Sequence, residues 1–577
     1  MTTLIPFPFP TKEDWKAAAT QALKGADFER TLYKKSYEGL SYEGLYTQRP
    51  SQDLSIRKRS GWQICQPFRD PDIERCVNAI VHDQYAGLEA AEIDGRIVDD
   101  TLLMQTLSHT PVNIPVYLET LTPELCLSED LPISGALIAP LGHWVQGQVT
   151  SPQHAYKTLL KLFKMQKERT KPLRYLLKVS SLDYAEAGAH AVQELSFVLA
   201  SCVEAFQQLL DKGLSCDEVL SATRIEVGVG TSFFMDLAKI RALRFLLHRL
   251  ASVYDCSHQP MTIHARTLQR PLSHFDIHNN YLRQTVGAAA AVLGGVDSLG
   301  TGAYNEINGI PDAEARRRAR NIQLVLKNEA YFDLLLDPAR GSFFVENLSC
   351  ELAEAAWAAF QSIEKQGGME MGLRSGRIQQ SVQDTAEQRL LGAARRRDVM
   401  VGVNLYATPE TKPTDHVLSA EPVTFPEAAS GIETLSPMRP AQLYEDLRAN
   451  KGWQDHQVLL VGLGPEKGVR ARAEFMQGVF ASVGVVPDMS PPLKSAEDLT
   501  AYIEEAKMPH TLVFCGSDEA YAQILPEVLS TLSANHPTTR WMLAGRPAEL
   551  DGFKEKGLNG CFYSGCNVVK TLESLLK

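Results

Sequence analysis

The sequence predicts an α/β protein in which a closed (β/α)8 barrel of the TIM-barrel type precedes a smaller, flavodoxin-like α/β domain. Short apolar segments alternate with long amphipathic ones from about residue 61 to residue 405, which is typical of a closed parallel barrel. A Pro-rich stretch follows, after which strand and helix patterns resume on a smaller scale. The 577 residues are enough for both units.

The alternation is clearest in the second half of the predicted barrel. Each expected strand is a short apolar run, and each expected helix repeats apolar residues at three- and four-residue spacing. The expected strands are 175–181, 223–229, 261–265 and 296–300, and the expected helices are 189–210, 235–252, 277–294 and 313–329. Since the active sites of such barrels lie at the carboxyl ends of the strands, we expect the mouth to hold Leu182, Asp183, Arg266, Asn305 and Glu306.

Residues 1–47 are expected to form a helix and an extended arm outside the barrel, which spans residues 48–406. Thr11 and Asp14 have the spacing of a capping box at the start of that helix. Arms of this kind gain burial by wrapping a neighbour, so we expect a subunit contact anchored by aromatic side chains. Alternatively, these aromatics pack on the chain's own barrel. They are Trp15, Tyr33, Tyr37, Tyr42 and Tyr46.

Residues 407–455 contain six prolines and little periodicity, so we expect a linker. The smaller α/β domain then covers residues 456–577. Its expected strands are 457–463, 511–515 and 540–544, with a helix over 470–483 and a closing helix after Gly565.

Composition and charge exclude several functional classes. The net charge is −11 and no long Lys/Arg run occurs, so binding to nucleic acid or to an anionic membrane is not expected. No apolar run reaches the ~18 residues that a membrane span needs, and the first ten residues do not have the pattern of a signal peptide. None of the ten cysteines forms a Cys-x-x-Cys motif, which favours a reduced, cytoplasmic protein without a zinc site.

Several motifs, in order along nearly the whole chain, resemble the barrel of the adenosylcobalamin-dependent methylmalonyl-CoA mutases. The resemblance implies the same barrel, followed by a degenerate cobalamin-binding domain. The motifs include Glu186-Ala-Gly188, Ala191–Leu195, Ala238–Ala242, Asn279-Asn280, Gly294–Thr301, Ala319–Gln323, Asp337-Pro338, Gly341–Glu346, Gly367–Met369 and Val401–Asn404.

The residues that such a mutase needs for substrate chemistry are absent. The resemblance implies a Tyr-His pair shortly before Glu-Ala-Gly, whose histidine donates a hydrogen bond to the substrate thioester. Here the pair is replaced by Leu182 and Asp183, and an ionised carboxylate accepts but cannot donate. An Asp183 with a raised pKa could still donate, although loss of function is the simpler interpretation. The arm that grips acyl-CoA is also missing; Arg57, Lys58 and Arg59 could hold CoA phosphates, but a solvated surface is the expected role of such a run.

Three further residues occupy positions that the family places near its cofactor. His264 and Glu306 keep the family's residue types, whereas Arg266 stands where the family has a glutamine. We interpret all three as vestigial, because a lone polar residue at a strand end commonly serves only its own hydrogen bonds. The sequence therefore predicts no catalytic residue and no cofactor-binding residue in this chain.

The resemblance also implies an Asp-x-His-x-x-Gly motif after the first strand of the second domain, whose imidazole ligates cobalt. After the strand ending at Leu463 the chain instead continues with Gly464-Pro-Glu-Lys-Gly468. No histidine occurs between His456 and His510, and His456 precedes the strand. We therefore expect no metal ligand and no bound cofactor in this chain.

The motifs that build the barrel are retained, and those that bind substrate and cobalt are lost. This pattern predicts the non-catalytic small subunit of a heterodimeric mutase, whose large catalytic partner binds adenosylcobalamin and interconverts (R)-methylmalonyl-CoA and succinyl-CoA. Two alternatives remain: a stand-alone mutase acting on another acyl-CoA, and a regulatory or protective binding protein for a mutase.

Overall fold

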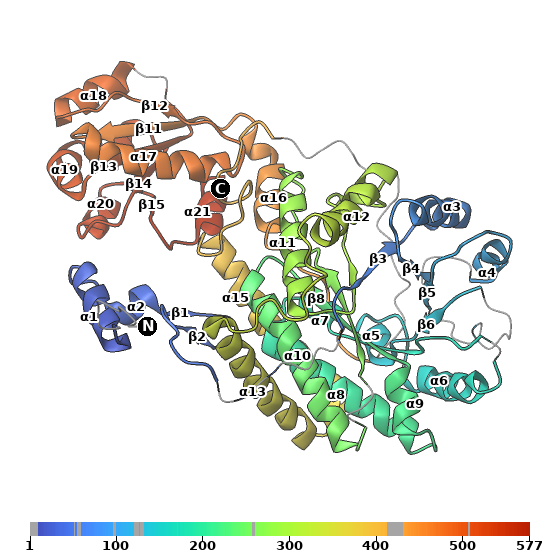
Figure 1. Cartoon of the computed structure of the whole chain (residues 1–577). Coiled ribbons are helices and arrows are strands. Elements are labelled where there is room, and N and C mark those ends of the chain that lie inside the picture. The colour runs from blue at the N-terminus through green and yellow to red at the C-terminus, as the bar shows by residue number, and fades with distance from the viewer. Residues whose placement is uncertain are drawn as a thin grey trace.

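The computed structural model describes residues 10–576 except 51, 53, 55–58, 96–99, 121–125, 127–131, 170, 257–259, 412–430 and 506–507. Figure 1 shows two α/β units, with the larger one formed by the earlier part of the chain. The expected fold class, a barrel followed by a second parallel-sheet domain, is confirmed.

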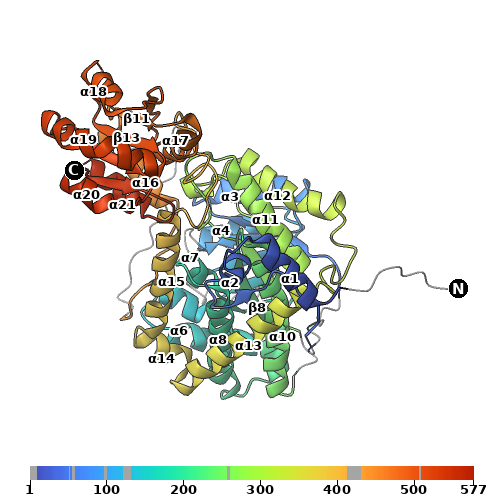
Figure 2. The same ribbon diagram turned by 90° about the vertical axis from the view of Figure 1, so that its left-hand side faces the viewer.

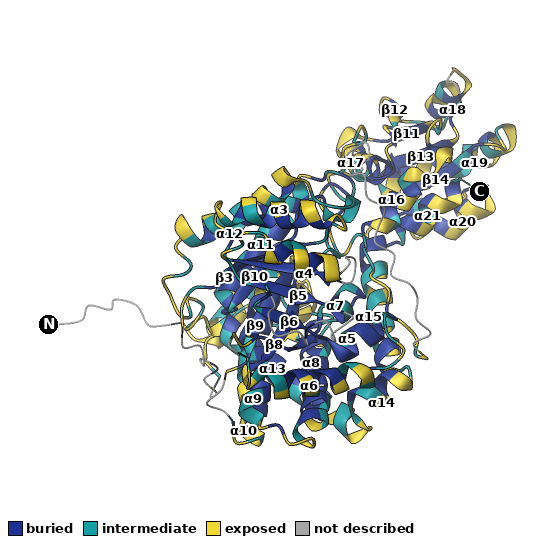
Figure 3. Ribbon diagram, turned by 90° about the vertical axis from the view of Figure 1, so that its right-hand side faces the viewer, coloured by how far each residue is buried: buried dark blue, intermediate teal, exposed yellow. Residues whose placement is uncertain are grey.

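Eight parallel strands form the barrel in the order β6-β5-β4-β3-β10-β9-β8-β7. A parallel bridge between Ile138 and Leu177 joins the two ends of this order and closes the sheet on itself. The strands are dark blue in Figure 3 because they are buried inside a ring of helices. They are β3 (Gln63–Phe68), β4 (Ala90–Asp94), β5 (Val116–Glu119), β6 (Gly135–Leu137), β7 (Leu177–Ser180), β8 (Thr223–Val229), β9 (Thr262–Thr267) and β10 (Ser298–Gly300).

The helices around the barrel bury their apolar faces on these strands, as the periodicity predicts. The long helices α8 and α13 pack against each other and against α10. The helices are α3 (Ile73–Gln84), α4 (Asp100–Ser108), α5 (Pro140–Val145), α6 (Gln153–Gln166), α7 (Leu182–Glu186), α8 (Ala191–Leu210), α9 (Cys216–Ser221), α10 (Phe233–Val253), α11 (Asn279–Gly294), α12 (Ala313–Asn328), α13 (Phe343–Lys365), α14 (Gly368–Arg374) and α15 (Arg377–Ala394), with a short 3-10 helix at Glu306–Asn308.

The N-terminal arm begins with α1 (Lys12–Ala22), whose start has the expected capping box between Thr11 and Asp14. The arm continues through α2 (Phe28–Leu32) and the hairpin strands β1 (Lys34–Lys35) and β2 (Ser41–Tyr42). Figure 2 shows it lying across one side of the barrel.

Three of the arm's tyrosines contact the chain's own barrel, as the alternative interpretation predicts, while the subunit contact of the arm stays a prediction. Tyr42 and Tyr46 pack against Phe344, with ring centres 5.8 and 5.4 Å apart. The Tyr37 hydroxyl donates to Asp398. By contrast, α1 has no buried residue, and Trp15 contacts Phe28 within the arm.

The second unit is a five-stranded parallel sheet in the order β12-β11-β13-β14-β15. Alternate residues of its strands enter two different cores, one under α16, α17 and α21 and the other under α18, α19 and α20. The elements are β11 (Val458–Leu463), α17 (Glu466–Ala481), β12 (Asp488–Met489), α18 (Ala496–Glu505), β13 (Thr511–Gly516), α19 (Asp518–Asn535), β14 (Arg540–Ala544), α20 (Leu550–Glu555), β15 (Gly560–Phe562) and α21 (Val568–Leu575).

The linker expected over residues 407–455 needs a correction at its end. Residues 442–449 form helix α16 (Gln442–Ala449), followed by a 3-10 turn at Lys451–Trp453. Tyr444, Leu447 and Trp453 are buried in a core of the second sheet, so this segment packs with the smaller unit. The prolines that precede it favour a linker and mask the three-residue spacing of Tyr444 and Leu447.

Candidate functional site

The barrel mouth beside β7 holds the two residues that replace the expected Tyr-His pair. Leu182 begins α7, and its backbone N–H donates to the Ser180 hydroxyl at 3.0 Å. Asp183 follows in the first turn and accepts a hydrogen bond from the side-chain amide of Gln146, one residue beyond α5. The carboxylate is therefore tied to the barrel wall rather than presented freely to the mouth.

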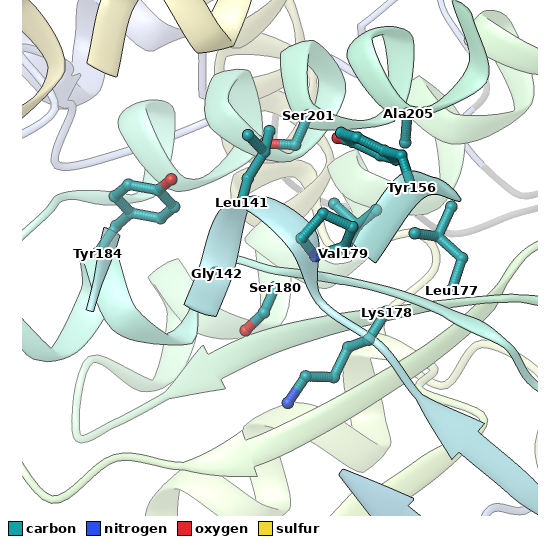
Figure 4. A pocket seen from close by; sticks show the side chains of 11 residues that line it. Leu141, Gly142, Tyr156, Leu177, Lys178, Val179, Ser180, Tyr184, Ser201 and Ala205 are labelled. Carbon is teal, nitrogen blue, oxygen red and sulfur yellow. The ribbon is translucent and has the colours of Figure 1, made fainter. Parts of the chain in front are cut away.

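A small cavity beside β7 lies on the side of the covering helices and is not lined by Leu182 or Asp183. Its volume is about 10 Å³. That volume holds about one water molecule. Figure 4 shows Tyr156, Ser201 and Ala205 on the helix side of this cavity, while the Lys178 side chain extends away from them.

Lys178 belongs to a network of buried charges inside the barrel. Its ammonium lies 2.8 Å from the Glu119 carboxylate and 3.2 Å from that of Glu226. In the same interior, Arg224 Nη2 lies 2.6 Å from Glu92 Oε2. All five side chains are buried, so each charge depends on its partner rather than on water.

His264 and Arg266, both on β9, border this network. His264 Nδ1 lies 2.8 Å from the Ser298 hydroxyl, and Nε2 lies 3.9 Å from Glu92. Burial and the nearby Arg224 and Arg266 hold the pKa of His264 well below its ordinary value, so the ring is neutral. Burial alone would lower the pKa of Arg266, but the surrounding glutamates, Glu92 first among them, raise it overall.

Glu306 lies at the start of the short 3-10 helix after β10, at the mouth. Gln284 Nε2 approaches its Oε1 to 3.4 Å. Burial raises the pKa of Glu306, with Arg266 opposing that shift. Of the three residues expected to be vestigial, Glu306 and Arg266 therefore interact electrostatically. The third, His264, contacts Ser298 instead.

Ligand atoms of Glu92, Glu226 and His264 lie within 4.8 Å of one another, which is close enough for a metal ion. Both carboxylates, however, already pair with cations, Glu92 with Arg224 and Glu226 with Lys178. A divalent cation here would add positive charge beside Arg224 and Lys178, so this arrangement favours the two ion pairs over a bound metal.

In the second sheet, the carboxyl edge between β11 and β13 is the usual ligand position of such a fold. Arg472 of α17 lies across this edge. Its Nη2 lies 2.6 Å from Asp518, and its guanidinium stacks 5.0 Å from the centre of the Tyr521 ring. A Cβ atom on Gly545 would come within 2.8 Å of Arg472 Nη1, which shows how closely the loop after β14 approaches it.

His456 lies at the opposite edge, before β11. Its Nε2 lies 2.9 Å from the Thr511 hydroxyl, and its ring stacks on His510 with centres 5.1 Å apart. Among the residues that the structure describes at the carboxyl edge, none is a histidine. Arg57 and Lys58, the other candidate cations for CoA, lie outside the described residues, and Arg59 is exposed.

Comparison with known proteins identifies the family. The family model described as methylmalonyl-CoA mutase matches residues 141–445, from α5 to α16. The chain belongs to the methylmalonyl-CoA mutase family. No helix among the described residues is long and apolar enough to cross a membrane.

The relatives within the mutase family include proteins named as its small subunit. The chain is 26% identical to the methylmalonyl-CoA mutase small subunit of Porphyromonas gingivalis, over 98% of this chain and 97% of that protein. It is 29% identical to the small subunit from Streptomyces virginiae, over 99% and 97% of the two chains. Among solved structures, dihydropteroate synthase from Thermus thermophilus matches 48% of this chain and 96% of its own with a TM-score of 0.27 and 13% identity, too weak a likeness to support an inference.

Proposed function

We propose that this chain is the non-catalytic small subunit of an adenosylcobalamin-dependent methylmalonyl-CoA mutase. A large subunit of the same family would then bind the cofactor and interconvert (R)-methylmalonyl-CoA and succinyl-CoA. The similarity to named small subunits over nearly the whole chain supports a mutase-family role. The observation that carries the non-catalytic assignment is that buried ion pairs fill the barrel interior.

Paired charges occupy the interior where a substrate would have to enter. Lys178, Arg224 and their carboxylate partners are buried in this interior. Sites for drug-sized ligands have volumes of about 300–1,000 Å³. Opening such a space would expose or separate these ion pairs, each of which is costly to break.

The described residues of the second sheet also do not fit a corrinoid. The edge that would hold its nucleotide tail is crossed by Arg472, and Tyr521 packs beneath that guanidinium. His456, a potential imidazole ligand, lies at the other edge and is engaged with Thr511. These residues therefore support no cobalamin chemistry in this chain.

Titration of the purified chain with adenosylcobalamin, followed by absorbance, tests this proposal. We expect no base-off spectrum at micromolar concentrations, and no conversion of methylmalonyl-CoA unless the large subunit is added. Tight corrinoid binding with turnover by the chain alone would instead support a stand-alone mutase. Full stability and turnover of the large subunit without this chain would support a separate regulatory role.

A further inference from the structure

Helix α6 carries a basic surface on a chain whose net charge is −11. Residues 153–174, which contain α6 and the turn after it, include seven Lys or Arg side chains and one acidic side chain, Glu168. Lys157, Lys161 and Lys164 follow one another at spacings of four and three residues, so they lie along one face of the helix. We call these three residues the lysine stripe.

The lysine stripe faces solvent and is not neutralised by the chain itself. All three residues are exposed, while the opposite face of α6 buries Leu159 and Phe163 in the barrel core. Within the part of the chain that the structure describes, no ion pair involves the stripe, although Lys167, three residues further on, pairs with Glu218 at 2.7 Å. Like charges on neighbouring turns of a helix repel one another, and an anionic partner would relieve this repulsion.

Helix α18 of the second unit presents the opposite charge in a similar arrangement. Its sequence contains four acidic side chains and no basic one. Leu499 and Ile503 are buried, and the acidic residues lie on the exposed side of the helix. We call the acidic residues the acidic stripe; they are Glu497, Asp498, Glu504 and Glu505.

Most of the acidic stripe is also available to a partner. Asp498 is occupied, because its Oδ2 accepts from the backbone N–H groups of Lys494 and Ser495 at 3.1 Å each, at the start of α18. Glu497, Glu504 and Glu505 have no ion pair with any residue that the structure describes. Three carboxylates are therefore left to meet cations from outside the chain.

The spacing of the charges agrees between the two stripes. Lys157 and Lys164 are seven residues apart, and so are Glu497 and Glu504. Seven residues span about 10.5 Å of helix axis, at 1.5 Å per residue. Two helices that lie side by side can therefore form both ion pairs at once, as charged residues beside a helix–helix contact do in coiled coils.

The two stripes cannot meet within one chain. Figures 1 and 3 show α6 on the side of the barrel away from the second unit, and α18 at the outer end of that unit. Pairing of the stripes therefore requires two copies of the chain. Because this contact uses two different surfaces, it is head-to-tail, and each end of the assembly keeps one stripe free.

We propose that the lysine stripe of one copy docks on the acidic stripe of a second copy, so that the chain associates head-to-tail through α6 and α18. At an ionic strength of ~0.1 M, exposed charges more than about 10 Å apart are largely screened. The general repulsion between two copies of net charge −11 is then weak, while lysine and glutamate side chains in direct contact still attract.

The composition of α6 favours a protein partner over two other anionic partners. Basic helices that bind membrane surfaces also present apolar side chains to the membrane, and surfaces that bind single-stranded nucleic acid present aromatic ones. The aromatic side chains of α6, Tyr156 and Phe163, pack in the barrel core together with its leucines. The lysine stripe therefore offers charge alone.

Sedimentation velocity of the full-length chain tests the proposal. We expect the sedimentation coefficient to rise with protein concentration up to about 300 µM at ~0.1 M salt and to stay at the monomer value at ~1 M salt, because exposed ion pairs are weak and are screened by salt. The triple substitution Lys157→Glu, Lys161→Glu and Lys164→Glu should abolish this rise. Circular dichroism verifies that each variant folds.

Reversal of the acidic stripe gives a second, complementary variant. The triple substitution Glu497→Lys, Glu504→Lys and Glu505→Lys should also abolish association. A mixture of the two reversed variants should associate again, to within about 3-fold of the wild-type association constant, because each copy then meets the opposite charge at both of its stripes. This recovery distinguishes charge pairing from damage to either helix.

The N-terminal arm offers a matched control. Lys24, Lys34 and Lys35 are exposed there, and replacing all three by glutamate changes the net charge as much as reversal of the lysine stripe does. This variant should associate like the wild type.

Each other outcome overturns the proposal. It is refuted if the wild-type sedimentation coefficient does not depend on concentration at ~0.1 M salt, or if association survives ~1 M salt or the lysine reversal. Absence of recovery in the mixture would show that the reversals act through another surface. Binding of a monomeric wild-type chain to phosphatidylserine vesicles or to single-stranded DNA, lost on lysine reversal, would assign the stripe to that partner instead. None of these measurements involves mutase activity, so the proposed function is tested separately.

Discussion

Replacing Arg224 by methionine tests whether the charge network stabilises the barrel. Arg224 Nη2 lies 2.6 Å from Glu92 Oε2, and its guanidinium lies 5.4 Å from the centre of the Tyr117 ring. Methionine removes the charge and leaves the Glu92 carboxylate buried without this partner. Removing one member of a buried pair costs about 3–5 kcal/mol. That is a large part of the ~5–15 kcal/mol by which a domain is stable.

Thermal unfolding measures the effect. In domains of ~150–250 residues, each kcal/mol lowers the Tm by about 2–4 °C. Because this barrel is larger, we expect Arg224→Met to lower the Tm by about 5–10 °C. Adding Glu92→Leu should recover most of the loss, because a buried ion pair can often be replaced by apolar residues of similar size.

An exposed pair provides the control. Arg317 Nε lies 2.9 Å from Glu314 on the surface of α12, and Arg317→Met should leave the Tm unchanged within error, because exposed pairs contribute little. An unchanged Tm in Arg224→Met, or an equal loss in the single and the double variant, would refute the stabilising role of the network.

Two further predictions concern the arm and the second unit. Tyr37→Phe removes the hydrogen bonds of the Tyr37 hydroxyl with Asp398 and Arg397. Since one such bond to a charged group contributes at least ~1.5 kcal/mol, protease cleavage after Lys35 should be about 10-fold faster than in the wild type. An unchanged cleavage rate would mean that other contacts hold the arm. Burial and the neighbouring His510 lower the pKa of His456 from 6.5 to about 4. Between these pH values the unfolded chain takes up a proton that the folded chain excludes. This residue therefore reduces the stability of the fold as the pH falls from about 6.5 towards 4. The variant His456→Gln should therefore show a smaller fall in Tm between pH 7 and pH 5, and a parallel fall would contradict this assignment.

The regular elements could be predicted because their local patterns agree with their burial. Strands β8 and β14 have the predicted bounds, since each is a short run with apolar residues that the barrel or the sheet buries. The sequence does not predict helix α16, because the run of prolines before it favours a linker, although Tyr444 and Leu447 have helical spacing.

The charge network could not be predicted, because a strand pattern does not tell which face is buried. In β8, Arg224 and Glu226 alternate with apolar residues, which is the pattern of solvent-facing side chains. Closure of the barrel turns that face inwards, where Lys178 and Glu92 from other strands meet it. The signal in the sequence that could have indicated a buried charge network is that Arg224 and Glu226, of opposite charge, lie on the same face of one strand. The contact of Arg472 with Asp518 likewise depends on tertiary structure.

The last prediction restores the residue pair that mutase chemistry needs. In the double variant Leu182→Tyr with Asp183→His, we expect the isolated chain to form no succinyl-CoA from methylmalonyl-CoA when adenosylcobalamin is supplied. Groups of a catalytic site act as a unit, so restoring one pair gains little when the others are absent. The new histidine would still lie beside Gln146, at the rim of an interior filled by Lys178 and its partners.

The complex provides the control for this variant. When paired with the intact large subunit it should keep wild-type turnover, because on our proposal the chemistry takes place in that subunit. When paired with a large subunit lacking its own catalytic histidine, the complex should be inactive. Turnover in that second complex, or in the isolated variant, would show that two residues suffice to reopen this barrel. The ion pairs inside it would then be no obstacle to substrate, and the non-catalytic assignment would lose the observation on which it depends.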